Sequence, residues 1–74
     1  MIIEVELFGQ LEPQLPRLQS IDVTESSIVL DVAKLLSLDL DKVGLITING
    51  IQCEELEKLP PDSRLCFFTH MSGG

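Results

Sequence analysis

Apolar and acidic residues alternate at the start of the chain, in the pattern of a half-buried β-strand. Successive residues of a strand face opposite sides, so the alternation over residues 3–7 places its apolar members toward a core. These members are Ile3, Val5 and Leu7. Residues 9–16, with one glycine and two prolines, predict a loop. A second strand is predicted over 17–23, with these apolar members: Leu18 or Ile21, and Val23.

A helix is predicted after the second strand. Ser26 or Ser27 is expected to cap its first N–H groups, and Asp31 lies early enough to favour the positive end of the helix dipole. Four apolar residues recur at helical spacing and predict one buried stripe: Ile28, Val32, Leu35 and Leu36. Because the stripe is short, the helix needs a sheet to pack on, and we expect it to end near Ser37.

A hairpin and a last strand are predicted in the second half of the chain. Residues 43–48 alternate again, and the Asn-Gly pair at 49–50 tolerates the positive φ angles of a tight hairpin turn. The return strand is predicted over 51–53. Residues 54–59 are expected to form a single helical turn, ended by the turn residues at 60–63. A last strand is predicted over 64–69.

The resulting order, β-β-α-β-β-β, predicts an α+β fold with one main helix. Seventy-four residues make one domain, 1–74, with a thin core, and residues 70–74 are expected to be a flexible C-terminal tail. The net charge of −7 argues against partners whose phosphates require basic patches, so neither nucleic acid nor an anionic membrane surface is expected. A basic protein partner would be attracted, although an acidic surface also simply keeps a small protein soluble. The acidic N-terminal segment lacks the apolar run of a signal peptide, and a cytoplasmic location is expected.

The folded part of the sequence offers little for catalysis or metal binding. His70, the one histidine, is expected to be a solvated tail residue. Cys53 and Cys66 match no metal-ligand or redox spacing and are interpreted as small packing residues. Three glutamates near the end of the hairpin are expected to form a solvent-exposed face: Glu54, Glu55 and Glu57. No metal, no bound cofactor and no enzyme active site are therefore expected in this chain.

The C-terminal residues carry the remaining chemistry. Met71 and Ser72 lead to Gly73 and Gly74, and two residues without Cβ atoms suit passage through a narrow active-site channel. A carboxylate is a poor electrophile, but conversion to an acyl-adenylate with ATP lets a sulfide or persulfide attack it and leave a thiocarboxylate. A Gly-Gly end is also common as a merely frayed terminus.

Four segments of this sequence carry a resemblance to a known family. They are IEVELFGQ at 3–10, ITING at 46–50, DSRLCFF at 62–68 and SGG at 72–74. The chain resembles the small subunit of molybdopterin synthase, within the ubiquitin-like sulfur carriers that include the thiamine-pathway carrier. The resemblance implies a β-grasp fold, in which the first and last strands lie parallel at the centre of a mixed sheet and the helix crosses one face.

The resemblance also implies a function. An E1-like enzyme would adenylate Gly74 with ATP, a sulfur donor would convert it to a thiocarboxylate, and Met71, Ser72 and Gly73 would pass into the pocket of a large catalytic subunit. That subunit would transfer sulfur to a pyranopterin, forming the dithiolene that binds molybdenum or tungsten. The chain itself would be a carrier, with the catalytic residues on its partner.

Two further features qualify this expectation. Phe8 and Phe68 fall opposite the expected core residues, which predicts an exposed aromatic patch for partner binding near the tail. Many family members have two prolines where this chain has Thr69 and His70, so its tail should be looser. Two alternatives stay open: a carrier for another product, such as a thiazole, an amino acid or a thiolated tRNA base, and a ubiquitin-like modifier or interaction module.

Overall fold

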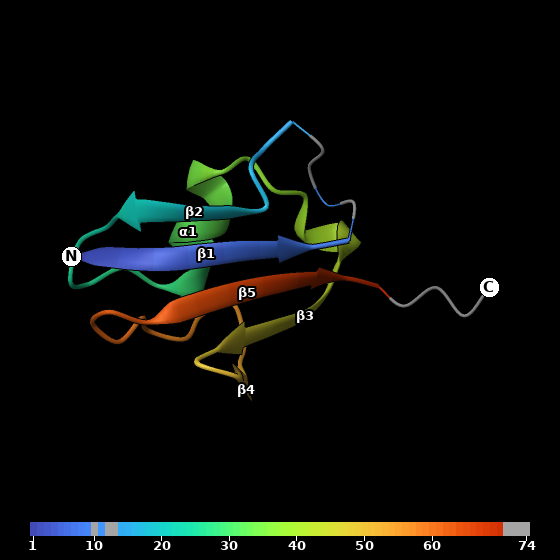
Figure 1. The fold of residues 1–74 in the computed structure, drawn as a ribbon. Coiled ribbons are helices and arrows are strands. Elements are labelled where there is room, and N and C mark those ends of the chain that lie inside the picture. The colour runs from blue at the N-terminus through green and yellow to red at the C-terminus, as the bar shows by residue number, and fades with distance from the viewer. Residues whose placement is uncertain (10, 12–13, 71–74) are drawn as a thin grey trace.

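The computed structural model of the chain is a five-stranded mixed sheet with one helix packed across it (Figure 1). The structure describes residues 1–9, 11 and 14–70. Its elements in chain order are β1 (Ile2–Phe8), β2 (Leu18–Asp22), α1 (Val29–Leu35), the 3-10 helix η1 (Leu40–Lys42), β3 (Val43–Ile48), β4 (Ile51–Gln52) and β5 (Arg64–Thr69). The predicted bounds of β3 and β5 are confirmed, and β2 and β4 are shorter than predicted.

The strand order is β2-β1-β5-β3-β4, with β1 and β5 at the centre. These two strands pair in parallel, with Leu7 beside Phe67 and Phe8 beside Phe68, whereas every other pair among the five strands is antiparallel. Because they run in the same direction, β1 and β5 end at the same margin of the sheet (Figure 1). This arrangement is the one predicted for a β-grasp fold.

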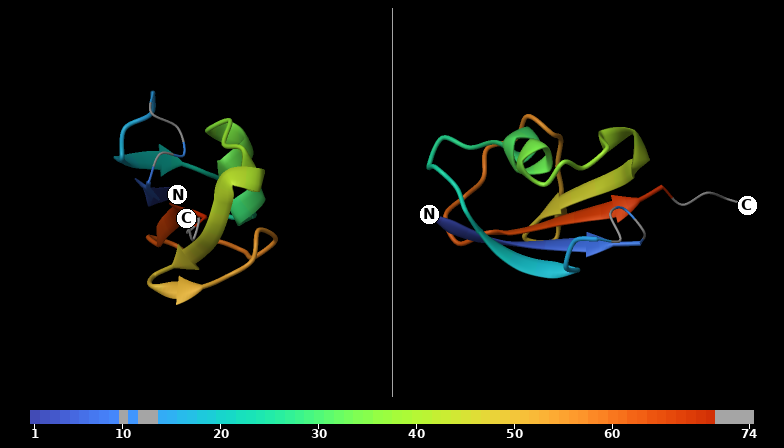
Figure 2. Two further views of the ribbon diagram at one scale, coloured as in Figure 1. Left: turned by 90° about the vertical axis from the view of Figure 1, so that its right-hand side faces the viewer. Right: turned by 90° about the horizontal axis from the view of Figure 1, so that it is seen from above.

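The core lies between the sheet and α1. Alternate residues of β1 and β5 point into it and are almost completely buried: Ile3, Val5, Leu7, Leu65 and Phe67. The helix covers this face of the sheet, as the view from above shows (right panel of Figure 2). On the opposite face, no helix of the described residues covers the sheet. We call that side the open face.

The buried face of α1 keeps two members of the predicted stripe, Val32 and the partly buried Leu36, and differs in the other two. Val29, Val32 and Ala33 are buried, whereas Leu35, which the stripe included, is 62% exposed. The reason lies at the start of the helix. Ile28 has extended backbone angles and forms a β-bridge with Lys58, so the helix begins one residue later than the apolar spacing suggested.

The predicted serine cap of α1 is also wrong. The carboxylate of Asp31 accepts a hydrogen bond from the Ile28 N–H at 2.9 Å and so satisfies the helix start from within its first turn. Ser27 is buried, and its hydroxyl lies 3.0 Å from the Thr24 hydroxyl. The two serine positions therefore belong to the turn before the helix rather than to its cap.

The single helical turn predicted over 54–59 is absent. Residues 55–56 form a turn instead, closed by a 3.2 Å hydrogen bond from the Glu57 N–H to the Glu54 carbonyl. Lys58 then continues into its bridge with Ile28, which ties this segment to the start of α1. A bridge requires extended backbone, and this explains why the helical pattern does not develop there.

Candidate functional site

The open face carries an aromatic pair where the two central strands end. Phe8 and Phe68 are register partners on β1 and β5. Their rings stack with centroids 4.6 Å apart and an interplanar angle of 8°. Both rings are half-buried, and the Arg17 guanidinium lies 5.0 Å from the Phe8 centroid, within cation–π distance. The predicted patch is therefore present as one stacked unit, which we call the aromatic pair.

A carboxylate holds both arginines of the sequence beside this pair. Glu6 Oε1 lies 2.7 Å from Arg64 Nη2, and Glu6 Oε2 lies 3.6 Å from Arg17 Nε. The Glu6 side chain is only 15% exposed, whereas both arginine side chains are more than half exposed. Pairs of this exposure add little to stability. Their consequence is orientational: the shared carboxylate keeps two guanidinium groups beside the aromatic pair on an otherwise acidic protein.

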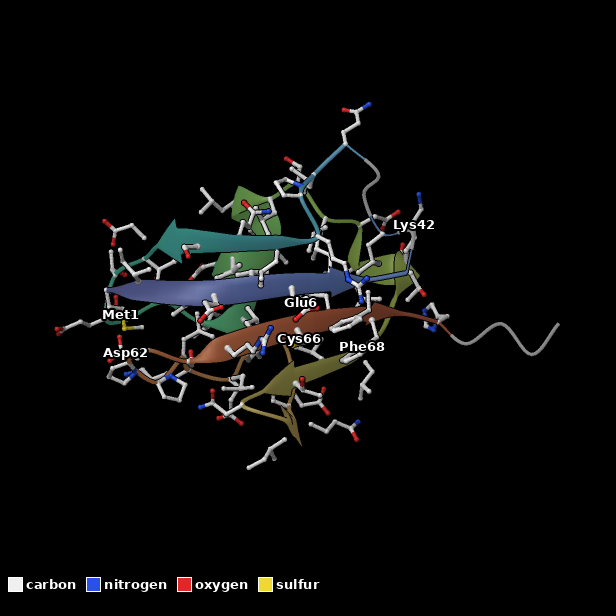
Figure 3. The ribbon with its side chains drawn as sticks, in the orientation of Figure 1. Met1, Glu6, Lys42, Asp62, Cys66 and Phe68 are labelled. Carbon is white, nitrogen blue, oxygen red and sulfur yellow. The ribbon has the colours of Figure 1, made fainter. Side chains whose placement is uncertain are left out.

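A shallow groove of about 620 Å³ lies on this face beside the aromatic pair. Its lining residues are Glu6, Phe8, Thr47, Asn49, Gly50, Arg64, Cys66 and Phe68. Figure 3 labels three of the residues that line it, Glu6, Cys66 and Phe68. Cys66 shares the face with Phe68, as predicted, but is 9% exposed and packs between its neighbours. Its burial supports the interpretation of this thiol as a packing residue.

The end of β5 is held on both flanks. Gly9, at a φ of +82°, lies against Thr69, and Gly44 lies against His70. The His70 N–H donates to the Lys42 carbonyl at 3.3 Å, and its ring Nε2 lies 2.9 Å from the Asp41 carbonyl oxygen. His70 is exposed, as expected, but these two contacts attach it to η1. Neither contact could be inferred from the sequence, because they join residues that are distant in the chain.

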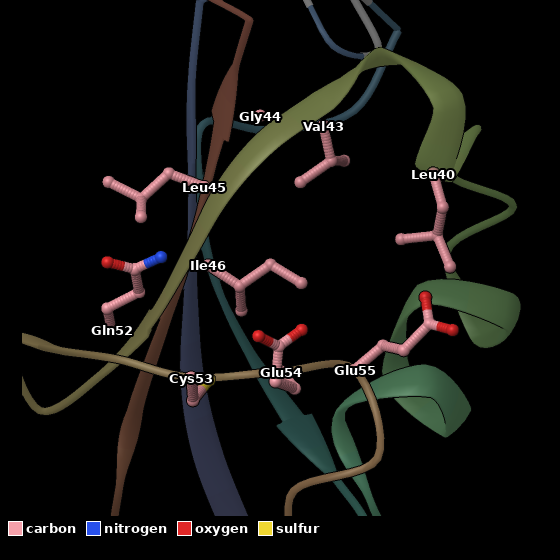
Figure 4. Close-up of a pocket in the computed structure, with 9 residues that line it drawn as sticks. All are labelled: Leu40, Val43, Gly44, Leu45, Ile46, Gln52, Cys53, Glu54 and Glu55. Carbon is pink, nitrogen blue, oxygen red and sulfur yellow. The ribbon is translucent and has the colours of Figure 1, made fainter.

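A second hollow, of about 320 Å³, lies at the other edge of the sheet, between β3 and the segment after β4 (Figure 4). Cys53 lines it and is half-exposed. Burial, followed by the nearby carboxylates of Glu57 and Glu54, raises the pKa of the Cys53 thiol. The thiol is therefore protonated at neutral pH and is a weak nucleophile. This hollow is separate from the aromatic pair, because it shares no lining residue with the groove beside that pair.

No group of three or more histidine, cysteine or acidic side chains is arranged to hold a metal ion within residues 1–9, 11 and 14–70. In that part of the chain, no helix is long and apolar enough to cross a membrane. The predicted tail residues lie outside the described residues: Met71, Ser72, Gly73 and Gly74. The structure thus places Phe8 and Phe68 together and describes the chain as far as His70, the first residue of the predicted tail, which is hydrogen-bonded to η1.

Comparison with known proteins gives likenesses of structure. No family model and no curated protein sequence matches the chain. A crystal structure of SAMP1 from Haloferax volcanii superimposes with a TM-score of 0.78 over 100% of both chains, at 22% sequence identity. A second crystal structure, of small archaeal modifier protein 1 from the same organism, gives 0.74 at 20% identity and covers 92% of this chain and 95% of that one. With the strand order and the single helix, these matches show that the chain has the ubiquitin-like β-grasp fold.

Proposed function

We propose that the protein is a sulfur carrier, activated at the carboxylate of Gly74. The observation that carries the proposal is the position of β5. This strand lies at the centre of the sheet, is held by two neighbouring strands, and ends at Thr69, four residues before Gly73 in the sequence. A rigid domain followed by two residues without Cβ atoms suits a protein that presents its end to an enzyme.

The proposed chemistry proceeds in two steps. The Gly74 carboxylate attacks the α-phosphate of ATP, forming an acyl-adenylate and releasing pyrophosphate. A sulfide, or the terminal sulfur of a protein persulfide, then attacks the acyl carbon and AMP leaves. With sulfide the product is a thiocarboxylate; with a persulfide the acyl disulfide formed first requires a thiol to reduce it. The catalytic groups belong to the E1-like activating enzyme, and this chain supplies the substrate carboxylate.

The aromatic pair is the proposed docking surface for that enzyme and for the acceptor of the sulfur. Phe8 and Phe68 offer a rigid, half-exposed apolar surface, and aromatic side chains of this kind are typical anchors of protein interfaces. Phe68 precedes His70 by two residues in the sequence. A partner that binds the aromatic pair would therefore lie close to the start of the C-terminal tail. Arg17 and Arg64 frame the same surface and favour an acidic rim on the partner.

We infer that the acceptor is the large catalytic subunit of molybdopterin synthase, which would make this chain the small subunit. The sequence resemblance at 3–10, 46–50 and 62–68 supports this choice. In that role the thiocarboxylate would supply sulfur for the dithiolene of the pterin cofactor. Supply of sulfur for a thiazole, an amino acid or a tRNA base uses the same tail chemistry and differs in the acceptor.

A second candidate function is protein modification. It is favoured by the name of the structural neighbour, small archaeal modifier protein 1. In that role the activated Gly74 carbonyl would join the amino group of a lysine on another protein. Isopeptide-linked species of higher mass in cell extract would indicate modification, whereas transfer of sulfur from the thiocarboxylate to an isolated acceptor, with the Gly74 carboxylate regenerated, would indicate carriage.

Adenylation is tested by ATP–pyrophosphate exchange with E1-like enzymes of sulfur-carrier pathways. We expect exchange that depends on the carrier and is lost when Gly73 and Gly74 are deleted. The matched control is Leu35→Ala, an exposed position on α1 outside both the aromatic pair and the tail, which keeps both glycines and should sustain exchange. Equal exchange with the truncated chain, or none with any competent activating enzyme, would rule out activation at Gly74.

A further inference from the structure

We propose that His70 is a positioning residue for the C-terminal tail. Its ring fastens the end of β5 to η1, so that the tail starts from a fixed point when an activating enzyme receives it. This inference rests on the proposed function and deepens it, because it assigns a role to a residue outside both the aromatic pair and the glycine end.

The first observation is that η1 offers two carbonyl groups to His70. The last carbonyls of a short helix lack partners within the helix. In η1 the Leu40 carbonyl accepts from the N–H of Val43. The next two carbonyls, of Asp41 and Lys42, accept from the His70 ring at 2.9 Å and from its backbone N–H at 3.3 Å. One residue therefore satisfies two successive groups at the end of η1.

The second observation concerns the state of the ring. A carbonyl oxygen only accepts hydrogen bonds, so His70 Nε2 must carry a hydrogen for the 2.9 Å contact to be a bond. The neutral ring is then the Nε2–H tautomer. A ring that rotates freely in solvent exchanges between both tautomers, with Nε2–H in the majority, so the contact is measurable as an Nε2–H tautomer with no Nδ1–H population.

The third observation is the space around the last two described residues. A Cβ on Gly44 would lie 2.8 Å from the His70 Cα and 3.1 Å from its Nδ1. A Cβ on Gly9 would lie 2.3 Å from the Thr69 Oγ1. Gly9 and Gly44 thus allow Thr69 and His70 to lie closer than any larger residue at these two positions would permit. His70 therefore packs directly against Gly44 of β3.

The function of this contact follows from conformational entropy. A tail that enters an active site loses freedom, and each backbone position already fixed in the free protein reduces that cost. Proline residues achieve this by covalent restriction of φ, whereas Thr69 and His70 have no such restriction. The contact with η1 supplies the restraint by hydrogen bonding. Its loss should raise the KM for the activating enzyme and leave kcat nearly unchanged, because the cost is incurred on binding.

The test compares three substitutions. His70→Gln keeps an N–H donor near the position of Nε2, His70→Asn places its donor near the position of Nδ1, and His70→Ala removes both. In steady-state adenylation we expect His70→Gln to resemble the natural protein. We expect His70→Asn and His70→Ala to raise KM about fivefold to tenfold, which corresponds to the ordering of about one residue. Thermal unfolding of each variant checks that the fold is retained.

A second readout does not depend on activation. Nitrogen-15 NMR of the free protein should show the Nε2–H tautomer of His70 and a backbone amide as rigid as those of β5. A Nδ1–H or averaged tautomer would overturn the contact itself. Equal KM values for all three variants, with the natural protein fully active, would overturn its role in positioning. Failure of the natural protein to be activated would instead reject the proposed function.

Discussion

Phe68→Ala separates the role of the aromatic pair in partner binding from its role in the fold. Phe68 is half-buried, and its ring stacks on Phe8 at 4.6 Å. Loss of the stacking and of the partly buried apolar area should lower the free energy of unfolding by about 1–2 kcal/mol. For a domain of this size each kcal/mol lowers the melting temperature by about 4–8 °C. The variant should therefore still be folded at room temperature.

The effect on binding should be larger. A central aromatic anchor of an interface contributes about 2 kcal/mol or more, which corresponds to a rise in Kd of about 30-fold. Isothermal titration calorimetry of the carrier with its activating enzyme measures this directly. Calorimetry at a temperature well below the melting point of the variant excludes unfolding as the cause.

The matched control is Leu35→Ala. Leu35 is also a large exposed apolar residue, at 62%, but it lies on α1, on the other side of the sheet. Its truncation should leave the Kd unchanged. Equal Kd values for the two variants would refute the assignment of the open face as the docking surface, and a rise with Leu35→Ala alone would move that surface to the helix.

Two further predictions concern stability. Gly9→Ala should destabilise the protein by more than Gly50→Ala. Both residues have positive φ angles, +82° and +84°. However, a Cβ on Gly9 would clash with the Thr69 Oγ1, whereas a Cβ on Gly50 would meet nothing within 4 Å. Chemical denaturation should show that Gly50→Ala lowers the free energy of unfolding by about 1 kcal/mol from backbone strain alone. Addition of Thr69→Ala should recover part of the extra loss caused by Gly9→Ala. Equal losses for the two glycine substitutions would contradict the close contact. For Cys53, the raised pKa means that the folded protein keeps the thiol proton after the unfolded chain has lost it, so the free energy of unfolding should fall as pH rises above the ordinary thiol value. Denaturation at about pH 7 and about pH 10 should show a smaller loss for Cys53→Ala than for the natural protein, and identical losses would mean that the pKa is not raised.

Alternating hydrophobicity predicted the sheet well. The bounds of β3 and the inward residues of β1 agree with the structure, because a strand with one buried face has a period of two that is legible in the sequence. The bounds of β5 also agree, although its sequence is a continuous apolar run rather than an alternating one. The prediction of the helix was less accurate. Its buried face depends on where the helix starts, and the bridge between Ile28 and Lys58, a contact between distant segments, decides that start.

In the candidate site, the sequence predicted the aromatic pair but not the contacts that Arg17 and His70 make around it. The alternation of β1 and β5 was enough to place Phe8 and Phe68 on one face, and parallel pairing of the two strands makes them neighbours. Arg17 precedes β2, and its approach to Phe8 depends on a loop whose path the sequence pattern does not define. The attachment of His70 to η1 likewise depends on a helix of three residues that no pattern in the sequence predicted.

The central claim is that Gly74 carries sulfur. The most direct test is tandem mass spectrometry of the C-terminal peptide after incubation of the protein with an E1-like enzyme, ATP and sulfide. The account predicts exchange of one oxygen for sulfur at the Gly74 carboxyl group, with Cys53 and Cys66 unchanged. Sulfur found on either cysteine with none at Gly74, or a mass unchanged with every competent activating enzyme, would contradict it.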